Sequence, residues 1–212
     1  MGGVGGVANA KVVVLGAGVA GQNAANIALG MGAEVTMLDT DLDKLRMSFW
    51  RYDNRVRQIA SSALSVREQV LAADLVIGTV LIPGKRAPKL VTQEMVARMK
   101  PGSVLVDVAI DQGGCFEGSR PTTHADPTFT VHNSTYYCVA NMPGAVPNTS
   151  TWALTNATLP YAVKLADQGW RAACQADKAL ALGLNTIAGQ LTCPGVAEAF
   201  DLPLVDVAAA VA

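Results

Sequence analysis

Three glycines and one acidic residue near the start of the chain have the types and spacing of a nucleotide-binding turn. The pattern GxGxxG occurs at Gly16-Ala17-Gly18-Val19-Ala20-Gly21, and Asp39 follows about 20 residues later. In such a turn the first glycine permits a tight bend, the second lets the backbone approach a pyrophosphate, and the third lets a helix pack closely on a strand. An acid at Asp39 would accept hydrogen bonds from ribose hydroxyls and repel a 2′-phosphate, which favours NAD over NADP. The alternative is a tight strand-to-helix turn that binds no ligand.

A second acidic residue, Asp111, lies in a loop that could carry chemistry. The segment Val108-Ala109-Ile110-Asp111-Gln112-Gly113-Gly114-Cys115-Phe116-Glu117 follows a predicted strand, which places Asp111 at the mouth of a nucleotide cleft. Two interpretations remain open from position alone. Asp111 caps the loop by accepting from the N–H groups of Gly113 and Gly114, or it positions a substrate or a proton-transfer water beside the nicotinamide.

The elements around these residues alternate in the way that would position them. Lys11–Leu15 and Glu34–Leu38 predict strands, and Gln22–Met31 between them predicts a helix that Gly32 ends. Further strands are predicted over 55–59, 74–80 and 103–108, and further helices over 41–52, 65–72 and 92–99. Repeated strand–helix units predict an α/β fold, a Rossmann-type doubly wound parallel sheet whose ligand lies at the carboxyl ends of the strands. The loops after Val80, Val108 and Val139 are therefore expected to line the site.

The pattern changes after about Asn141, where prolines and a polar stretch precede helical segments. Helices are predicted over 151–174, 177–182 and 196–200, with no sheet of their own. We therefore expect a dinucleotide-binding Rossmann domain over 1–145 and a helical segment over 146–212 that forms part of another domain.

Composition and charge exclude several other classes of protein. The formal net charge is −1 and no basic run occurs, so a nucleic-acid partner is not expected. No stretch is long and apolar enough to predict a membrane span, and the uncharged start of the chain does not resemble a secretory signal, so a cytoplasmic location is expected. Four separated cysteines without a CxxC pair, and His124 and His132 spaced by eight, predict no metal site.

Four motifs make the chain similar to a known family. They are VVVLGAGVAGQNAANIALGMGAEVTMLD, ADLVIGTVLIPGKRAPKLV, KPGSVLVDVAIDQGGCFEGSRPTTH and YYCVANMPGAVPNTST, and together they resemble the NAD-binding part of bacterial alanine dehydrogenase. The resemblance implies reversible, NAD-linked oxidative deamination of L-alanine to pyruvate and ammonium, usually in a homo-oligomer. It also implies that the helical segment resembles the C-terminal part of the substrate domain.

The resemblance further implies roles for individual residues. Asp39 and Lys44 would contact the adenosine end of NAD, with Ser61 near the adenine and Val80 and Leu81 along the cofactor. The nicotinamide-side contacts would be Val108, Ala109, Ile110, Asp111, Arg120, Val139, Ala140, Asn141 and Met142. Asp111 would be the catalytic residue.

This sequence also departs from the family pattern. Family members are longer, with an N-terminal part that supplies an Arg and a Lys for the substrate and a His for acid/base work. Met1–Val7 resembles the segment just before the first nucleotide-binding strand, so the chain is expected to be truncated and catalytically incomplete alone. Gln168 replaces a histidine that can bind metal in longer members, so no metal is expected there.

Two other functions stay open at this point. The missing part leaves room for a non-catalytic NAD-binding or assembly module. The NAD-binding component of proton-translocating transhydrogenase is a second alternative, because it shares a segment like LIPGKxAPKLV. That family has Gln-Asn where this chain has Asp111-Gln112, which favours the dehydrogenase.

Overall fold

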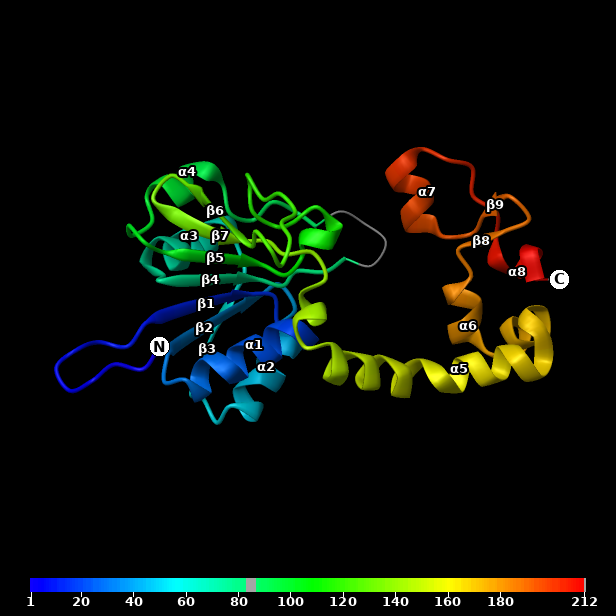
Figure 1. Cartoon of the computed structure of the whole chain (residues 1–212), viewed down its shortest axis with the longest axis horizontal. Helices are drawn as coiled ribbons and strands as arrows, with labels where there is room; N and C mark the ends of the chain where they lie inside the picture. The colour runs from blue at the N-terminus through cyan, green and yellow to red at the C-terminus, as the bar shows by residue number, and fades with distance from the viewer. Residues whose placement is uncertain (83–86, 212) are drawn as a thin grey trace. The chain divides into compact units, whose positions relative to one another are not determined.

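The structure of the chain is a computed structural model that describes residues 1–82 and 87–211 (Figure 1). The described residues form two units, one of residues 1–82 and 87–142 and one of residues 143–211. Residues 83–86, inside the motif ADLVIGTVLIPGKRAPKLV, lie outside the described residues, as does residue 212.

A seven-stranded sheet in the order β3-β2-β1-β4-β5-β7-β6 forms the centre of the first unit (Figure 1). Its strands are β1 (Lys11–Leu15), β2 (Glu34–Asp39), β3 (Arg57–Ala60), β4 (Leu75–Gly78), β5 (Val104–Asp107), β6 (Thr128–Val131) and β7 (Ser134–Tyr137). All neighbouring strands are parallel except β6, which runs antiparallel to β7. The strand order reverses between β1 and β4, which is the switch point where such sheets bind ligands. The prediction of a Rossmann-type doubly wound sheet is confirmed.

Helices cover both faces of this sheet because its central strands β1 and β2 are buried on both sides. Val12 and Val14 of β1 pack with α1 (Val19–Gly30) and α2 (Leu42–Arg51) in one buried cluster. Val13 and Leu15 pack with α3 (Ala63–Ala72) and α4 (Gln93–Ala97) in another. Such double burial explains the uninterrupted valine run of β1. Because β1 to β5 and β7 pair in parallel, their carboxyl ends lie at one edge of the sheet.

Several boundaries in the first unit differ from the sequence predictions by two residues or more. The helix predicted from Ser65 begins at Ala63, because the side chain of Ser62 caps it. The helix predicted from Gln22 begins at Val19, because Gly18 has the extended backbone of an N-cap. The strand predicted from Arg55 begins at Arg57, because Asp53 and Asn54 have positive φ and hold a turn. The predicted strand 74–80 ends at Gly78, where Thr79 turns to bond the end of β1. The β6–β7 hairpin was missed.

The second unit contains α5 (Pro147–Ala176), α6 (Lys178–Gly183), α7 (Pro194–Phe200) and α8 (Val207–Val211). Gly169 has φ 74 and interrupts α5, so this element is two helices joined at a kink. The expectation of helices without any sheet was wrong, because β8 (Thr186–Ile187) and β9 (Gln190–Leu191) pair antiparallel. Ala188 and Gly189 form their turn, and both have positive φ, as a tight hairpin requires. No helix in the described ranges is long and apolar enough to cross a membrane.

Candidate functional site

The glycine-rich turn joins β1 to α1 at the switch point of the sheet. Gly16 has φ +105, and its N–H group donates to the carbonyl oxygen of Leu38 at 2.8 Å. The hydroxyl of Thr79 donates to the carbonyl oxygens of Leu15 and Gly16 at 2.9 and 3.1 Å. The turn is thus tied to β2 on one side and to the end of β4 on the other.

The three glycines of the pattern meet different surroundings. A Cβ atom on Gly21 would lie 1.9 Å from the carbonyl oxygen of Gly16, so this glycine lets α1 approach the turn. A Cβ atom on Gly16 would lie 2.9 Å from the hydroxyl oxygen of Thr79, and the positive φ also favours glycine there. A Cβ atom on Gly18 would meet nothing within 4 Å. The fold therefore requires Gly16 and Gly21, whereas Gly18 borders open space.

The N-terminus of α1 next to this open space has the properties of an anion site. No side chain caps it, no acidic residue lies in its first turn, and Val19 and Ala20 are exposed. The first N–H groups of a helix have no partner within the helix, and the helix dipole adds positive potential at this end. A pyrophosphate group fits this end of α1 in charge and in hydrogen bonding.

Asp39 ends β2 beside the turn, where the sequence predicts it. Its carboxylate accepts from the N–H group of Ala17 at 2.6 Å and from the N–H group of Asp41 at 2.8 Å. These bonds use a different oxygen each, and a carboxylate oxygen can accept more than one hydrogen bond. Asp39 is therefore held in place and can still accept from ribose hydroxyls.

Two other residues predicted at the adenosine end lie near Asp39. The N–H group of Ser61 donates to the carbonyl oxygen of Asp39 at 2.9 Å, which places Ser61 at the same edge. Lys44 lies on α2, with its ammonium 3.6 Å from the carboxylate of Asp41. Asp41 caps α2, and the hydrogen bond from the Lys44 N–H group lowers the pKa of its carboxyl.

The residues predicted along the rest of the cofactor follow β4, β5 and β7. Val80 is half-buried and Leu81 is exposed, whereas Ala109 and Ile110 are 6% and 4% exposed and their side chains belong to the core. Only the backbone of those two residues is available to a ligand, while Val108 keeps an exposed side chain.

The segment after β7 carries the last group of predicted contacts. Val139 is buried, Ala140 and Met142 are half-buried, and Asn141 is exposed with φ +55. A ring nitrogen of His124 lies 3.2 Å from the carbonyl oxygen of Asn141.

Asp111 lies exposed in a short 3-10 turn, Ile110–Gln112, after β5. The interpretation of Asp111 as the cap of the following loop is wrong. The N–H groups of Gly113 and Gly114 donate to the carbonyl oxygens of Ile110 and Ala109, both at 3.0 Å. Within residues 1–82 and 87–211, the Asp111 carboxylate has no hydrogen-bond or ion-pair partner.

The residue that caps this loop is Asp107, which the sequence analysis missed. It is fully buried at the end of β5 and accepts from the N–H groups of Cys115 and Phe116 at 2.9 and 3.3 Å and from the Ser119 hydroxyl at 2.5 Å. The available signal was its position, because Asp107 ends the apolar run VLVD just as Asp39 ends EVTMLD.

Lys89 binds carbonyl groups of the same loop, and the sequence did not predict this role. Its ammonium donates to the carbonyl oxygens of Gly113, Gly114 and Phe116 at 2.6, 2.8 and 3.1 Å. Nothing in the sequence near Lys89 signals these contacts, because they join residues 24 to 27 positions apart.

Two further side chains of the loop region, Cys115 and Arg120, have partners within the protein. Burial, followed by the nearby charge of Asp107, raises the pKa of the Cys115 thiol far above its usual range, so it stays protonated and is a poor nucleophile. The guanidinium of Arg120 lies 4.2 Å from the centre of the Phe129 ring on β6. All four cysteines are free, and the described residues contain no group of three His, Cys, Asp or Glu side chains that could hold a metal ion.

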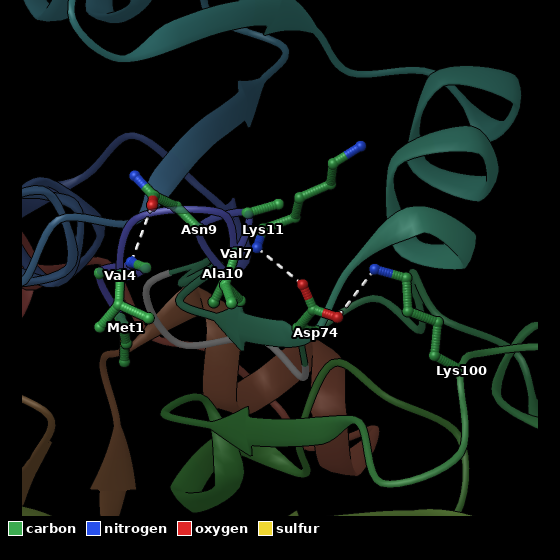
Figure 2. A pocket seen from close by; sticks show the side chains of 11 residues that line it. Met1, Val4, Val7, Asn9, Ala10, Lys11, Asp74 and Lys100 are labelled. Carbon is green, nitrogen blue, oxygen red and sulfur yellow. Dashed lines mark hydrogen bonds and ion pairs between the residues drawn. The ribbon is translucent and has the colours of Figure 1, made fainter.

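A separate hollow lies at the amino ends of the strands, as Figure 2 shows. The carboxylate of Asp74 accepts there from the Lys11 N–H group and from the Lys100 ammonium, both at 2.8 Å. Because Asp39 and Asp111 follow the carboxyl ends of their strands, this hollow is at the opposite edge of the sheet.

Comparisons with known proteins show the family of the chain. The family model described as "Alanine dehydrogenase/PNT, C-terminal domain" matches residues 1–194. An alanine dehydrogenase of Mycolicibacterium smegmatis is 61% identical over 208 residues, which are 98% of this chain and 56% of that protein. An alanine dehydrogenase of Mycobacterium tuberculosis is 58% identical over 212 residues, which are 100% of this chain and 57% of that protein.

Among solved structures, an alanine dehydrogenase is more similar to the chain than a transhydrogenase is. A structure named L-alanine dehydrogenase aligns with a TM-score of 0.85 and 49% identity, over 94% of this chain and 55% of that one. A transhydrogenase from Sinorhizobium meliloti aligns with a TM-score of 0.62 and 34% identity, over 69% of this chain and 42% of that one. The chain thus spans a little over half the length of the alanine dehydrogenases that it matches.

Proposed function

The chain belongs to the alanine dehydrogenase/PNT C-terminal domain family, an NAD(P)-binding domain, and from this premise we propose that its first unit binds NAD(H). The reaction that we propose for the whole protein is the reversible oxidative deamination of L-alanine to pyruvate and ammonium. The observation that carries the proposal is the uncapped start of α1 beside open space at Gly18, with Asp39 held at the end of the next strand.

Each part of this edge has a separate task in binding. The N–H groups at the start of α1 would hold the pyrophosphate, and Gly18 leaves room for it. The carboxylate of Asp39 would accept from the ribose hydroxyls, and its charge would repel a 2′-phosphate. This repulsion is the reason to propose NAD in preference to NADP.

The carboxyl end of β5 would lie beside the nicotinamide, where the reaction takes place. NAD supplies a hydride acceptor when it is bound. β2 and β5 lie on opposite sides of the β1–β4 pair, so the nicotinamide end is expected near Asp111 when the adenosine end is near Asp39. The exposed carboxylate of Asp111, without a partner in the part of the chain that the structure describes, would hold a proton or position a water there.

Turnover of alanine is proposed for a protein that also contains the remainder of its relatives' length. By the resemblance, that remainder supplies an Arg and a Lys for the substrate and a His for acid/base work. The second unit would then belong to the substrate domain, as the resemblance implies, and the assembly would be a homo-oligomer. For this chain alone we propose NAD(H) binding with little or no turnover.

A titration of NADH with the purified chain tests the proposal directly. We expect the fluorescence of NADH to change on binding, NADPH to bind more weakly, and Asp39→Asn to narrow that difference. An assay with alanine and NAD at alkaline pH in the same sample should give no appreciable NADH. Absence of NADH binding by the folded chain would refute the proposal, and rapid turnover would refute its last part.

Two alternatives remain. A non-catalytic NAD-binding or assembly module would bind NADH in these assays without turnover, and alanine-dependent NADH production by this chain would exclude it. A transhydrogenase component is supported less, because the matching structure is less similar and Asp111-Gln112 stands where that family has Gln-Asn.

A further inference from the structure

We propose that Asp107 and Lys89 are positioning residues that hold the loop 110–119 so that Asp111 faces the nicotinamide end of the cofactor. This inference rests on the proposed function, because it assigns the loop to one half of the NAD(H) site. Neither residue belongs to the GxGxxG turn, and neither is expected to touch the cofactor. Their effect on binding would pass through the shape of the loop.

Asp107 is a buried carboxylate whose donors all come from this loop. The N–H groups of Cys115 and Phe116 and the hydroxyl of Ser119 point at it, and no cation pairs with it among the described residues. A Cβ atom on Gly114, which has φ +72, would lie 2.6 Å from the Asp107 carboxylate. Such close approach, in a site that excludes water, makes each of these charge-assisted bonds strong.

Lys89 complements Asp107 by binding the carbonyl groups of the loop. The segment around Lys89 runs beside the loop. The N–H group of Ala87 donates to the carbonyl oxygen of Gln112 at 3.0 Å, and that of Leu90 donates to the carbonyl oxygen of Cys115 at 2.8 Å. The ammonium of Lys89 donates to three further carbonyl oxygens of the loop. One anion thus binds N–H groups of the loop and one cation binds its carbonyl groups, in addition to the backbone bonds from residues 87–91 and the β-bridge between Val91 and Phe116.

The position of Asp111 is set by the contacts on both sides of its turn, together with the backbone bonds within the turn. Ile110 anchors one side of the turn in the core at 4% exposure, and Gly113 and Gly114 on the other side are held through Lys89. The Asp111 side chain is exposed and makes no bond of its own within the described ranges. If the loop relaxed, Asp111 would move while the GxGxxG turn, on other strands, would stay in place.

Two ligands separate this role from a general effect on folding. ADP-ribose carries the adenosine half and the pyrophosphate of NADH but lacks the nicotinamide. We expect Asp107→Asn and Lys89→Met to weaken NADH binding by about tenfold or more, as loss of a charge-assisted bond predicts, and to leave ADP-ribose binding within about twofold. Hydrogen exchange of the amides of residues 113–119 should become faster in both variants without ligand.

Matched controls come from the opposite edge of the sheet. Asp74 accepts from the N–H group of Lys11 and from the ammonium of Lys100 (Figure 2). Asp74→Asn and Lys100→Met therefore remove the same charges as Asp107→Asn and Lys89→Met, at a place that does not touch the loop. We expect both controls to bind NADH and ADP-ribose within about twofold of the unchanged chain.

The outcomes separate the two proposals. Failure of the unchanged chain to bind either ligand would overturn the proposed function. If it binds both ligands, then unchanged NADH affinity in Lys89→Met, or an equal loss of NADH and ADP-ribose affinity, would overturn the positioning role alone. Should Asp107→Asn fail to fold, Lys89→Met still decides the matter, because Lys89 is an exposed residue.

Discussion

Adding one methyl group to Gly18 or to Gly21 should have opposite consequences for stability and for binding. The Cβ atom of Gly21→Ala would lie 1.9 Å from the carbonyl oxygen of Gly16. To restore ordinary contact, α1 would have to move by about 1.5 Å from a backbone atom that cannot rotate away. Overpacking of this kind costs about 1–3 kcal/mol, and we expect the upper end here.

The Cβ atom of Gly18→Ala would meet nothing within 4 Å, and the φ of −73 at this residue suits alanine. Loss of the glycine N-cap and the smaller entropy of the unfolded chain act in opposite directions, so stability should change by less than about 1 kcal/mol. The new methyl group would occupy the space proposed for the pyrophosphate. We expect NADH affinity to fall by about tenfold or more.

Thermal unfolding and NADH fluorescence on the same samples measure both effects. For a chain of this size a loss of about 3 kcal/mol in Gly21→Ala lowers Tm by about 6–12 °C, whereas Gly18→Ala should remain close to the unchanged chain. Full NADH affinity in Gly18→Ala would refute the placement of the pyrophosphate. An unchanged Tm in Gly21→Ala would refute the account of the turn.

Five further outcomes are expected. Gly78→Ala should lower the free energy of unfolding by about 1–3 kcal/mol in a urea titration, because its Cβ atom would lie 2.2 Å from the Cys115 sulfur and 2.7 Å from the Phe116 ring. Because burial and then a nearby carboxylate raise the pKa of the Cys115 thiol, it should resist iodoacetamide near pH 8 in native protein, as mass spectrometry of labelled peptides would show; rapid labelling would contradict this. The same shift means that its contribution to stability is present below the ordinary thiol pKa of 9.0 and is lost as pH rises above that value, which unfolding at several alkaline pH values would measure. Ser62→Ala removes a capping box from α3 and should lower the free energy of unfolding by about 1 kcal/mol in the same urea titration. Asp111→Asn, at an exposed residue, should change the free energy of unfolding by less than about 0.5 kcal/mol.

Local pattern was sufficient to predict strands β1 to β5 and to propose the adenosine half of the site. The valine run of β1 and the spacing of Gly16, Gly18 and Gly21 are properties of neighbouring residues, so they can be read without the fold. Asp39 follows from the same reasoning, because it ends the strand that comes next along the chain. The resemblance to alanine dehydrogenase rests on such contiguous motifs as well.

Element boundaries and short hairpins were beyond that reasoning. β6 and β7 are four residues each and rich in threonine and tyrosine, and their pairing extends the sheet only because β7 lies beside β5. The strands β8 and β9 have two residues each, which is too short for an alternating hydrophobic pattern to be recognised in the sequence. Strand pairing of this kind depends on partners that are distant in the chain.

The sequence by itself determined that a nucleotide turn, an acidic strand end and an Asp-Gln-Gly-Gly loop occur in one α/β fold. Only the tertiary structure decided which acid holds that loop. Asp111 lies two residues before Gly113 in sequence, yet Asp107 accepts from N–H groups of the loop and Lys89 donates to its carbonyl groups. The reason is physical: a buried carboxylate must collect donors, and which N–H groups can reach it depends on how the chain after β5 folds back over the sheet.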